Sequence, residues 1–411
     1  MLSTSDTKPA CEAHVGLTRR LRKEVGAGLE YLWELSGSLR LNLADAVLVE
    51  GTERETGLPM ATFYFGHYDN FAFVLSRLYS EHQIVEKHTR INSLRVKQWT
   101  GRYENSADLL CVDVELLYCS MLRADGFLQI PQWIRQKYVI PDSWEKVLAS
   151  FRRNTRKTDL RKVRKYGFTY QITKSDADFE HFYHHMYVPY LSKRFGDEVI
   201  IEPAWKVLRQ CQKGELMHIV RDGHVVAAVL LHQLGTRLAY VWVGVPDDLD
   251  DELYMGAFSA MYYFTIHHGY SRGCEEIDFL GSRPLLNDGL FRYKRKWGTF
   301  VEDSPVPRGD ILLKPLQFTA PVQSFFHNNK FIVRDGKDLV GKVLLNHEPA
   351  TKEQVENLWC QYQTKGLREL RVFSLEGFDS EAYNWADDGS VSMRLIDLSD
   401  LPDPGQAFCR V

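Results

Sequence analysis

The residues best suited to take part in a reaction lie in FRYKRKWG, residues 291–298, where two arginines and two lysines fall within five positions. A helix turns by about 100° per residue, so the pattern can be projected onto a wheel counted from residue 290. It then has an apolar side and a basic side (Leu290, Phe291, Tyr293 and Trp297 against Arg292, Arg295 and Lys296). Lys294 is the exception, because it falls at about 40°, near the middle of the apolar side.

An ammonium in that position invites two interpretations. Burial without a partner costs several kcal/mol or lowers the pKa of the lysine. The aliphatic stem of Lys294 could pack on the core while its nitrogen reaches water. Alternatively, Lys294 could serve as a preorganised donor to negative charge that develops on a carbonyl oxygen. The residues alone leave both interpretations open.

The elements before this segment define the expected scaffold. Three apolar, β-branched runs lie between Glu215 and Val245, separated by Asp222-Gly223 and by Leu234-Gly235-Thr236, which predicts three antiparallel strands. A nearly all-apolar helix should follow over Glu252–His268 and stop at Gly269. The strand EEIDFL must then return beside the third strand, so we expect a mixed sheet with a crossover.

The chain of 411 residues exceeds the usual size of one core, so two or more domains are expected. A helix near residues 29–39 comes first. The run from Met60 then predicts a strand, a polar turn and a helix, and DLLCVDVELL near Asp108 is strand-like. A new unit should begin after Pro141, with a helix from Ser143 whose apolar residues recur at helical spacing.

Composition excludes several classes of protein. The net charge of −3 gives no overall field toward DNA or an acidic membrane. Seven scattered cysteines without CxxC spacing and an N-terminus without an apolar signal core indicate reduced thiols and a cytoplasmic location. No apolar run reaches the roughly 18 residues of a spanning helix. Peripheral membrane contact remains open.

A second basic segment lies between Arg152 and Lys165, where eight Lys or Arg residues accompany one acid, Asp159. Such a run is usually a solvated helix face. The alternative is a helix that faces phosphate groups.

The segment HFYHHMYVPYLSKRFG, from His181, contains three histidines, and residues 181 and 185 would share a helical face. No carboxylate or cysteine spacing completes a zinc site, so no metal is expected. Its aromatic and cationic side chains predict substrate recognition, with core packing of the tyrosines as the alternative (His185, Tyr187, Tyr190 and Arg194).

The strand order from Glu215 to Val301, followed by DFLGSRPLLNDGLFRYKRKWG, resembles the GNAT-fold acyltransferases, and within them the branch of the Fem-type (FemAB-like) peptidyltransferases. Those proteins typically contain two GNAT-like domains. They end the second with Gly-Ser, a turn and an aromatic-Lys-x-x-aromatic-Gly element, here residues 293–298. The resemblance is good from about residue 143 to 301, vaguer from 60 to 141, and absent from 311 onward.

The resemblance implies an α/β (α+β) fold with tandem GNAT-like domains, whose mixed, mainly antiparallel sheets are flanked by helices. The expected boundaries are 1–141 for a degenerate N-terminal GNAT-like domain, 142–310 for the acyltransferase domain and 311–411 for a C-terminal α/β extension. It also implies an N-acyltransferase that uses an acyl-CoA or acyl carrier protein thioester and a primary amine, either long-chain or derived from an amino acid. By this resemblance Lys294 stabilises charge on the transferring carbonyl.

Roles for the neighbouring residues follow from that reading. Asp278 could accept a proton or hold the acceptor ammonium, or could simply pair with an arginine, and Tyr293 of the motif completes the catalytic group. Arg283, Asn287 and Asp288 could line the acceptor site, although the last two could instead cap a helix. Arg292 and Lys296 are assigned to the donor's phosphates.

The expected donor loop departs from the family. Many GNAT enzymes hold the pyrophosphate of coenzyme A on a Gln/Arg-x-x-Gly-x-Gly/Ala loop, whereas this chain has PDDLDDELYMGAF from Pro246, whose aspartates repel phosphate. An aminoacyl-tRNA donor is therefore an alternative. A third hypothesis is a non-catalytic binding protein on a GNAT scaffold.

Overall fold

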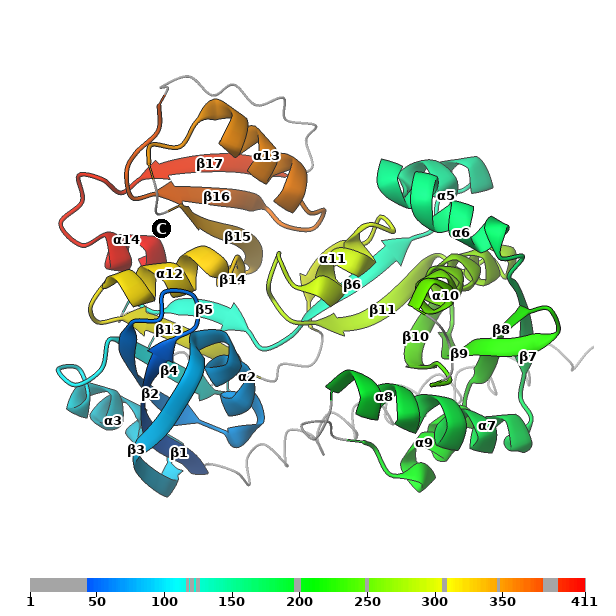
Figure 1. Ribbon diagram of the computed structural model, residues 1–411, viewed down its shortest axis with the longest axis horizontal. Coiled ribbons are helices and arrows are strands. Elements are labelled where there is room, and N and C mark those ends of the chain that lie inside the picture. The colour runs from blue at the N-terminus through cyan, green and yellow to red at the C-terminus, as the bar shows by residue number, and fades with distance from the viewer. Residues whose placement is uncertain are drawn as a thin grey trace, which may run out of the picture. The chain divides into compact units, whose positions relative to one another are not determined.

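The computed structural model describes residues 43–410 except 116–117, 119–121, 123–125, 196–200, 248–250, 305–308, 346–347 and 380–390. The helix expected near residues 29–39 lies outside this described part. The chain divides into two compact units: unit 1 is Met1–Ile130, Pro305–Phe326 and Leu401–Val411, and unit 2 is Pro131–Ser304 and His327–Asp400. Helices and three sheets that mix parallel with antiparallel pairs confirm the predicted α/β class (Figure 1).

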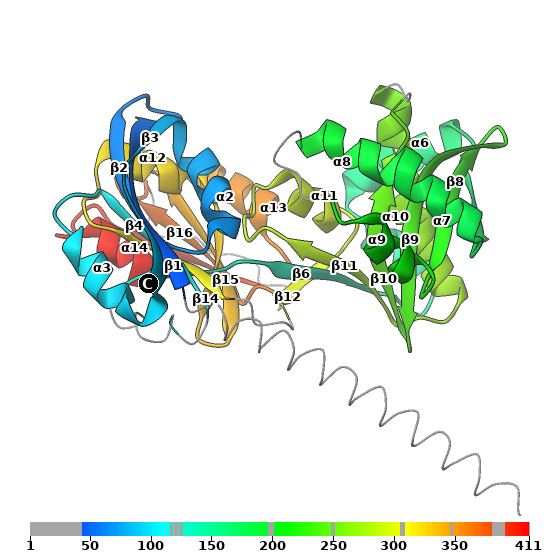
Figure 2. The ribbon, with the colours of Figure 1, turned by 90° about the horizontal axis from the view of Figure 1, so that it is seen from below.

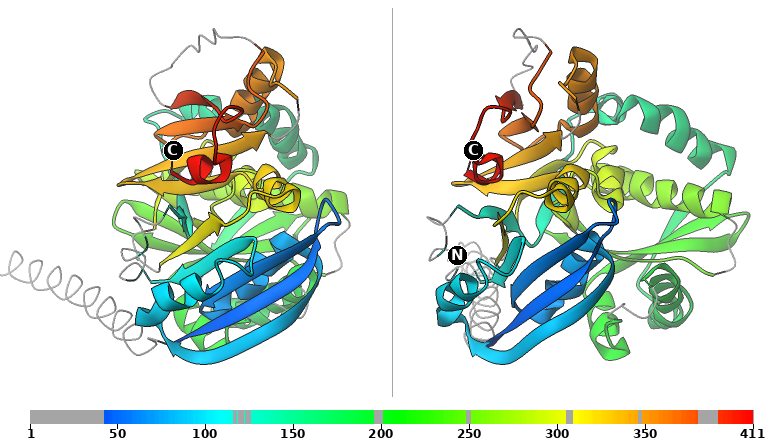
Figure 3. Two further views of the ribbon diagram at one scale, coloured as in Figure 1. Left: turned by 90° about the vertical axis from the view of Figure 1, so that its left-hand side faces the viewer. Right: turned by 60° about the vertical axis from the view of Figure 1, so that its left-hand side comes forward.

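Unit 1 is built on a sheet with the order β3-β1-β2-β4-β13-β5. Its strands are β1 (Leu43–Glu53), β2 (Pro59–Gly66), β3 (Tyr79–Asn92), β4 (Leu109–Val114), β5 (Leu128–Pro131) and β13 (Asp310–Pro315). Its helices are α2 (Tyr68–Leu78), the short 3-10 turn η1 (Ser93–Arg95), α3 (Val96–Arg102), α12 (Ala320–Asn328) and α14 (Pro404–Arg410). The strand and helix predicted from Met60 are β2 and α2, and Figure 3 shows this sheet in two views.

Unit 2 contains a seven-stranded sheet with the order β12-β6-β11-β10-β9-β8-β7. Its strands are β6 (Ile134–Val139), β7 (Thr169–Thr173), β8 (Glu215–Arg221), β9 (His224–Leu234), β10 (Arg237–Gly244), β11 (Glu276–Ser282) and β12 (Phe300–Asp303). The predicted antiparallel strands are β8, β9 and β10. The β8–β9 turn is two residues long, and Asp222 and Gly223 both have positive φ, as such a turn requires.

One long helix, α10 (Asp251–Ser271), packs against this sheet and contacts β8, β9 and β11 (Figure 1). Its predicted end at Gly269 is wrong, because the helix continues to Ser271 and the left-handed residue after it is Gly273. Gly269 serves close packing instead: a Cβ at this position would lie 2.4 Å from Cδ1 of Ile277. A glycine therefore lets the helix approach β11.

The remaining helices of this part of unit 2 cover α10 and the sheet. They are α5 (Trp144–Ser150), the π-helical turn η3 (Thr155–Asp159), α6 (Leu160–Lys165), α7 (Asp176–Phe182), the π-helical turn η4 (Tyr183–Tyr187), α8 (Val188–Phe195), α9 (Ala204–Cys211) and α11 (Gly289–Arg295). The helix predicted from Ser143 is α5, and the Ser143 hydroxyl accepts from the Lys146 N–H at 3.3 Å.

The last part of unit 2 forms a four-stranded sheet, β14 (Phe331–Asp335), β15 (Asp338–Leu345), β16 (Glu369–Ser374) and β17 (Ser392–Asp397), with α13 (Lys352–Tyr362) between β15 and β16. The division of the structure differs from the expected boundaries. Residues 134–139 pair with β11 and β12 of unit 2 (Figure 2), and residues 310–315 pair with β4 of unit 1. Long-range strand pairing, which periodicity does not reveal, decides both memberships.

Candidate functional site

Lys294 lies on α11 and is 4% exposed, which confirms that its side chain points into the protein. Its Nζ donates to the carbonyl oxygen of Gly281 at 2.7 Å and contacts that of Leu280 at 3.5 Å. The ammonium is thus bound to backbone oxygens of β11. The helix that holds it begins at the N-cap Asp288, whose Oδ1 accepts from the Phe291 N–H at 2.9 Å.

The helical projection is correct for Lys294 but wrong for two neighbouring residues. Arg295, expected on the solvent side, is 6% exposed, and Leu290, expected on the apolar side, is 39% exposed. Arg295 is buried where its guanidinium donates to Thr364 Oγ1 and to the carbonyl oxygen of Gln363, the residue after α13. A second packing surface on α11 therefore overrides the two-sided pattern.

Burial lowers the pKa of Lys294 to about 7, and the nearby carboxylates Asp278 and Asp288 oppose the shift. An ammonium in a water-poor site loses hydration, and this favours its neutral form. Lys294 is therefore poised to change charge near neutral pH.

Asp278 is completely buried in β11. Its Oδ1 accepts from the Leu280 N–H at 2.9 Å, and its Oδ2 lies 2.8 Å from Nε of Arg135 on β6. This is the arginine pair that the sequence left open as an alternative to proton transfer. The sequence did not single out Arg135, because nothing local links residues 135 and 278.

The strands beside Lys294 separate. Parallel pairing of β10 with β11 covers three positions, Arg237–Ala239 with Glu276–Asp278. Beyond them β11 follows β6, with a bulge between Asp278 and Gly281. Leu280, inside the bulge, has φ +58°, a left-handed conformation that costs roughly 1–2 kcal/mol for a residue with a Cβ. Strain of this kind concentrates at functional sites.

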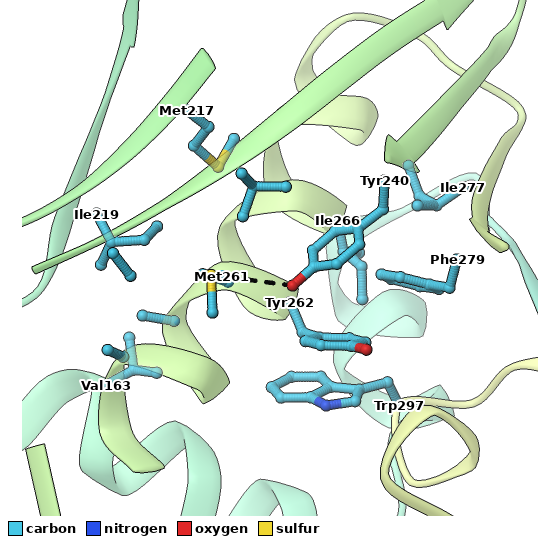
Figure 4. Packing of buried hydrophobic residues seen from close by; sticks show 14 of the residues in the cluster. Val163, Met217, Ile219, Tyr240, Met261, Tyr262, Ile266, Ile277, Phe279 and Trp297 are labelled. Carbon is cyan, nitrogen blue, oxygen red and sulfur yellow. Dashed lines mark hydrogen bonds between the residues drawn. The ribbon is translucent and has the colours of Figure 1, made fainter. Parts of the chain in front are cut away.

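Aromatic side chains gather where the strands separate (Figure 4). The ring of Tyr262, from α10, stacks on Phe279 at 4.8 Å and on Trp297 at 5.8 Å between centroids. Tyr240, from β10, lies 5.4 Å from Phe279, and its hydroxyl points to the sulfur of Met261. These rings form an apolar wall beside the end of the strand pairing.

Tyr293 faces a different group from Lys294. Its hydroxyl lies 3.3 Å from Ser259 Oγ, and burial raises its pKa. Lys296 Nζ lies 3.7 Å from the centre of the Tyr293 ring and 2.7 Å from Oδ1 of Asp159. Ser259 donates to the same oxygen at 2.8 Å. Lys296 is therefore paired with a carboxylate, and no local sequence pattern links it to Asp159.

The predicted recognition segment is split between surface and core. His185 is exposed and stacks on His181 at 4.8 Å, whereas Tyr187 and Tyr190 are buried. Arg194 donates to the Tyr190 hydroxyl at 3.2 Å. The packing alternative therefore holds for both tyrosines, while His185 and Arg194 present polar groups at the surface.

The residues expected around the acceptor have structural contacts. Arg283 lies over the Trp133 ring at 4.2 Å. Asn287 donates to the Asn328 carbonyl oxygen at 2.7 Å and accepts from the Lys330 N–H at 3.3 Å, and Asp288 caps α11. Arg292 is exposed on α11. The structure thus places Lys294 and Asp278 together and Tyr293 with Lys296. Tyr190 of the 181–196 segment reaches the aromatic cluster beside them, because its ring lies 5.8 Å from Phe258, which in turn lies 6.4 Å from Tyr293.

Residues 248–250 of the expected donor loop lie outside the described part of the chain. Of the eight Lys and Arg side chains between Arg152 and Lys165, six are exposed, and Arg152 and Lys162 are partly buried. Within the described residues, no group of three or more His, Cys, Asp or Glu side chains could hold a metal ion. None of the described helices has the length and apolar composition needed to cross a membrane.

Comparison with known proteins identifies the domain. Residues 149–295 match the family model of the acetyltransferase (GNAT) domain. No curated protein sequence matches the chain. Among solved structures, it is similar to FemX, with 15% identity and a TM-score of 0.35 over 66% of this chain and 84% of that one. It is also similar to L-PGS from Bacillus licheniformis, with 12% identity and a TM-score of 0.31 over 66% of this chain and 85% of that one. A tandem GNAT protein from clavulanic acid biosynthesis is similar too, with 12% identity and a TM-score of 0.28 over 67% of this chain and 83% of that one.

The family match covers α6, the strands β7 to β11 and the helices α10 and α11, including Lys294. Its description agrees with the family expected from the strand order and the Lys294 motif. Unit 2 therefore carries an acetyltransferase (GNAT) domain over residues 149–295, and this domain identifies the chain as an acyltransferase.

Proposed function

We propose that unit 2 is an N-acyltransferase that moves an acyl group from an acyl-CoA or acyl carrier protein thioester to a primary amine. The observation that carries this proposal is the separation of β10 from β11 beside the buried Lys294. Beyond Ala239, β10 has no strand partner on its β11 side within the described residues, and we infer that an extended donor binds along this edge.

Lys294 is the residue we assign to the developing oxyanion. As the amine attacks the thioester carbonyl, the C–N bond forms, the C–S bond breaks and the amine proton passes to the leaving thiolate. A positioned donor to the carbonyl oxygen stabilises this transition state more than the ground state. Asp278 then acts through Lys294, because the Asp278 carboxylate favours the charged form of the Lys294 side chain. Tyr293 remains the proposed third member of the catalytic group.

The acceptor is a primary amine, either long-chain or amino-acid-derived. The exposed His185 and the surface guanidinium of Arg194 support a role for the 181–196 segment in binding it, with the buried Tyr190 positioning Arg194. Arg283, Asn287 and Asp288 act by shaping the turn before α11. For the donor's phosphates, the exposed Arg292 is a better candidate than Lys296, which already pairs with Asp159.

A second candidate function is amide formation from an aminoacyl-tRNA. The exposed cations of η3 and α6 favour it, because such a face suits a phosphate backbone. A thioester donor and an RNA donor differ in salt dependence: only RNA-dependent transfer should fall steeply as salt rises. A non-catalytic binding role would instead leave Lys294→Met with full biological activity.

The test is an acyl-transfer assay with acetyl-CoA, palmitoyl-CoA and acyl carrier protein donors and a panel of amines, comparing wild type with Lys294→Met. Loss of one oxyanion donor should reduce kcat by about 10²–10³-fold. Lys330→Met is the matched control, because Lys330 is also buried and donates to a backbone carbonyl oxygen, that of His327. Burial lowers the pKa of Lys330 as well, to about 8. Equal activities for Lys294→Met and Lys330→Met would refute the role of Lys294.

A further inference from the structure

Guanidinium groups converge at the C-terminal end of α13, away from Lys294. Arg295 donates through Nη1 to the Gln363 carbonyl oxygen at 3.4 Å and to Thr364 Oγ1 at 3.2 Å, and through Nη2 to the Gln361 carbonyl. Arg152 Nη2 donates to the same Gln363 oxygen at 3.2 Å. Two cations therefore share one neutral acceptor.

A third cation, Arg292, lies one turn before Arg295 on α11 and is exposed. Burial, and then the charges of Arg152 and Arg292, lower the pKa of Arg295 to about 9. Burial and Arg292 also lower the pKa of Arg152. The three guanidiniums are therefore close enough to repel one another.

The positive charge has no carboxylate partner. Within the described part of the chain, no ion pair involves Arg152, Arg292 or Arg295, and the buried Nε of Arg295 has no hydrogen-bond partner. The C-terminus of a helix supplies about half of one negative charge, which is too little for three cations. The cluster is thus electrostatically incomplete without an anion.

We propose that Arg152, Arg292 and Arg295 form a phosphate-binding site. A dianionic phosphate offers several acceptors to planar guanidinium forks and matches the excess charge. Arg152 and Arg295 are held by backbone oxygens of residues 361–363, so the two cations are positioned before the ligand arrives. The exposed Arg292 completes the site from the solvent side. In this proposal, the part of unit 2 after residue 327 supplies the backbone oxygen of Gln363 that positions Arg152 and Arg295.

The site does not include Lys294, although it shares Arg292 with the proposed donor contacts and, for a donor phosphate, rests on the proposed function. Lys294 and Arg292 lie two residues apart on α11, about 200° around the helix axis, so they face different surroundings. The phosphate could belong to a nucleotide-containing donor, a phospholipid headgroup or free phosphate, and all three offer the same chemistry to the arginines.

The test is calorimetric titration of the full chain with inorganic phosphate at low chloride, comparing wild type with Arg292→Gln and Arg152→Gln. Each variant should weaken binding by about tenfold or more. Arg209→Gln, at an exposed arginine on α9, is the matched control and should bind like wild type. Absence of phosphate binding to wild type, or equal binding by all variants, overturns the proposal.

Two further arms identify the source of the phosphate. Competition by coenzyme A but not by dephospho-coenzyme A points to the nucleotide's 3′-phosphate. Sedimentation with vesicles of anionic phospholipid, lost in Arg292→Gln, points to a headgroup. Lys294→Met should bind phosphate like wild type, so failure of the acyl-transfer proposal and failure of this one give different results.

Discussion

Each unit contains a parallel strand pair that ends at a buried aspartate, and the two pairs differ in what surrounds that aspartate. In unit 1, β2 and β4 pair over five positions, up to Gly66 with Asp113. In unit 2, β10 and β11 pair over three, up to Ala239 with Asp278. Both carboxylates are 0% exposed. The first pair of strands stays closed to its end, and the second separates.

The partners of the two aspartates explain the difference in chemistry. Asp113 Oδ2 accepts from the Tyr64 hydroxyl at 2.9 Å and from Asn70 Nδ2 at 3.1 Å, both neutral donors. Asp278 instead pairs with Arg135 and acts on the charge of Lys294. Hydrogen bonds from Tyr64 and Asn70 stabilise the buried Asp113 carboxylate. A cation held beside separated strands can act on a ligand, so unit 2 is where we expect the reaction.

The largest expected effect is the pH dependence of stability. The pKa of Lys294 is about 7 in the folded state and near its ordinary 10.5 when unfolded, so the unfolded state binds more protons between these values. The unfolding free energy of wild type relative to Lys294→Met should rise with pH across this window, by at most about 1.4 kcal/mol per pH unit. Urea denaturation at several pH values measures it. A flat difference would mean that Lys294 keeps its ordinary pKa.

Asp278→Asn should destabilise the protein by about 3 kcal/mol, because Arg135 loses its buried partner while the amide oxygen can still accept from Leu280. It should also reduce acyl transfer, since the charged form of Lys294 loses support. Denaturation and a kcat measurement on folded protein give both values. Unchanged kcat would confine Asp278 to a purely structural role.

Asp113→Asn is the corresponding change in unit 1. It should cost about 1–3 kcal/mol, because an amide N–H would face the donors Tyr64 and Asn70. The kcat of the folded protein should equal that of wild type. A fall in kcat comparable to that of Asp278→Asn would contradict the assignment of the reaction to unit 2.

The smallest effect is expected for Asp288→Ala, which removes the N-cap of α11 and should cost about 1 kcal/mol. If Asp288 only caps the helix, the KM for the amine stays unchanged. Ser175→Ala, at the N-cap of α7, is the matched control. A rise in KM for Asp288→Ala but not for Ser175→Ala would instead place Asp288 in contact with the acceptor.

The local elements of unit 2 could be predicted from the order of the amino acids alone. Alternating apolar runs with Asp222-Gly223 fixed the β8–β9 hairpin, and helical spacing placed Lys294 on an inward face. Such patterns are readable because burial of one face has a fixed period in a helix or a strand. The family expectation came from the same local order.

The partners of those elements could not be predicted in this way. Arg135 with Asp278, Asp159 with Lys296, and Arg152 with the end of α13 join residues far apart in the chain. The same holds for the burial of Arg295 and for the membership of β6 and β13 in their sheets. Long-range contacts arise from packing and hydrogen bonding between elements, and a periodicity within one element carries no information about which neighbour it meets.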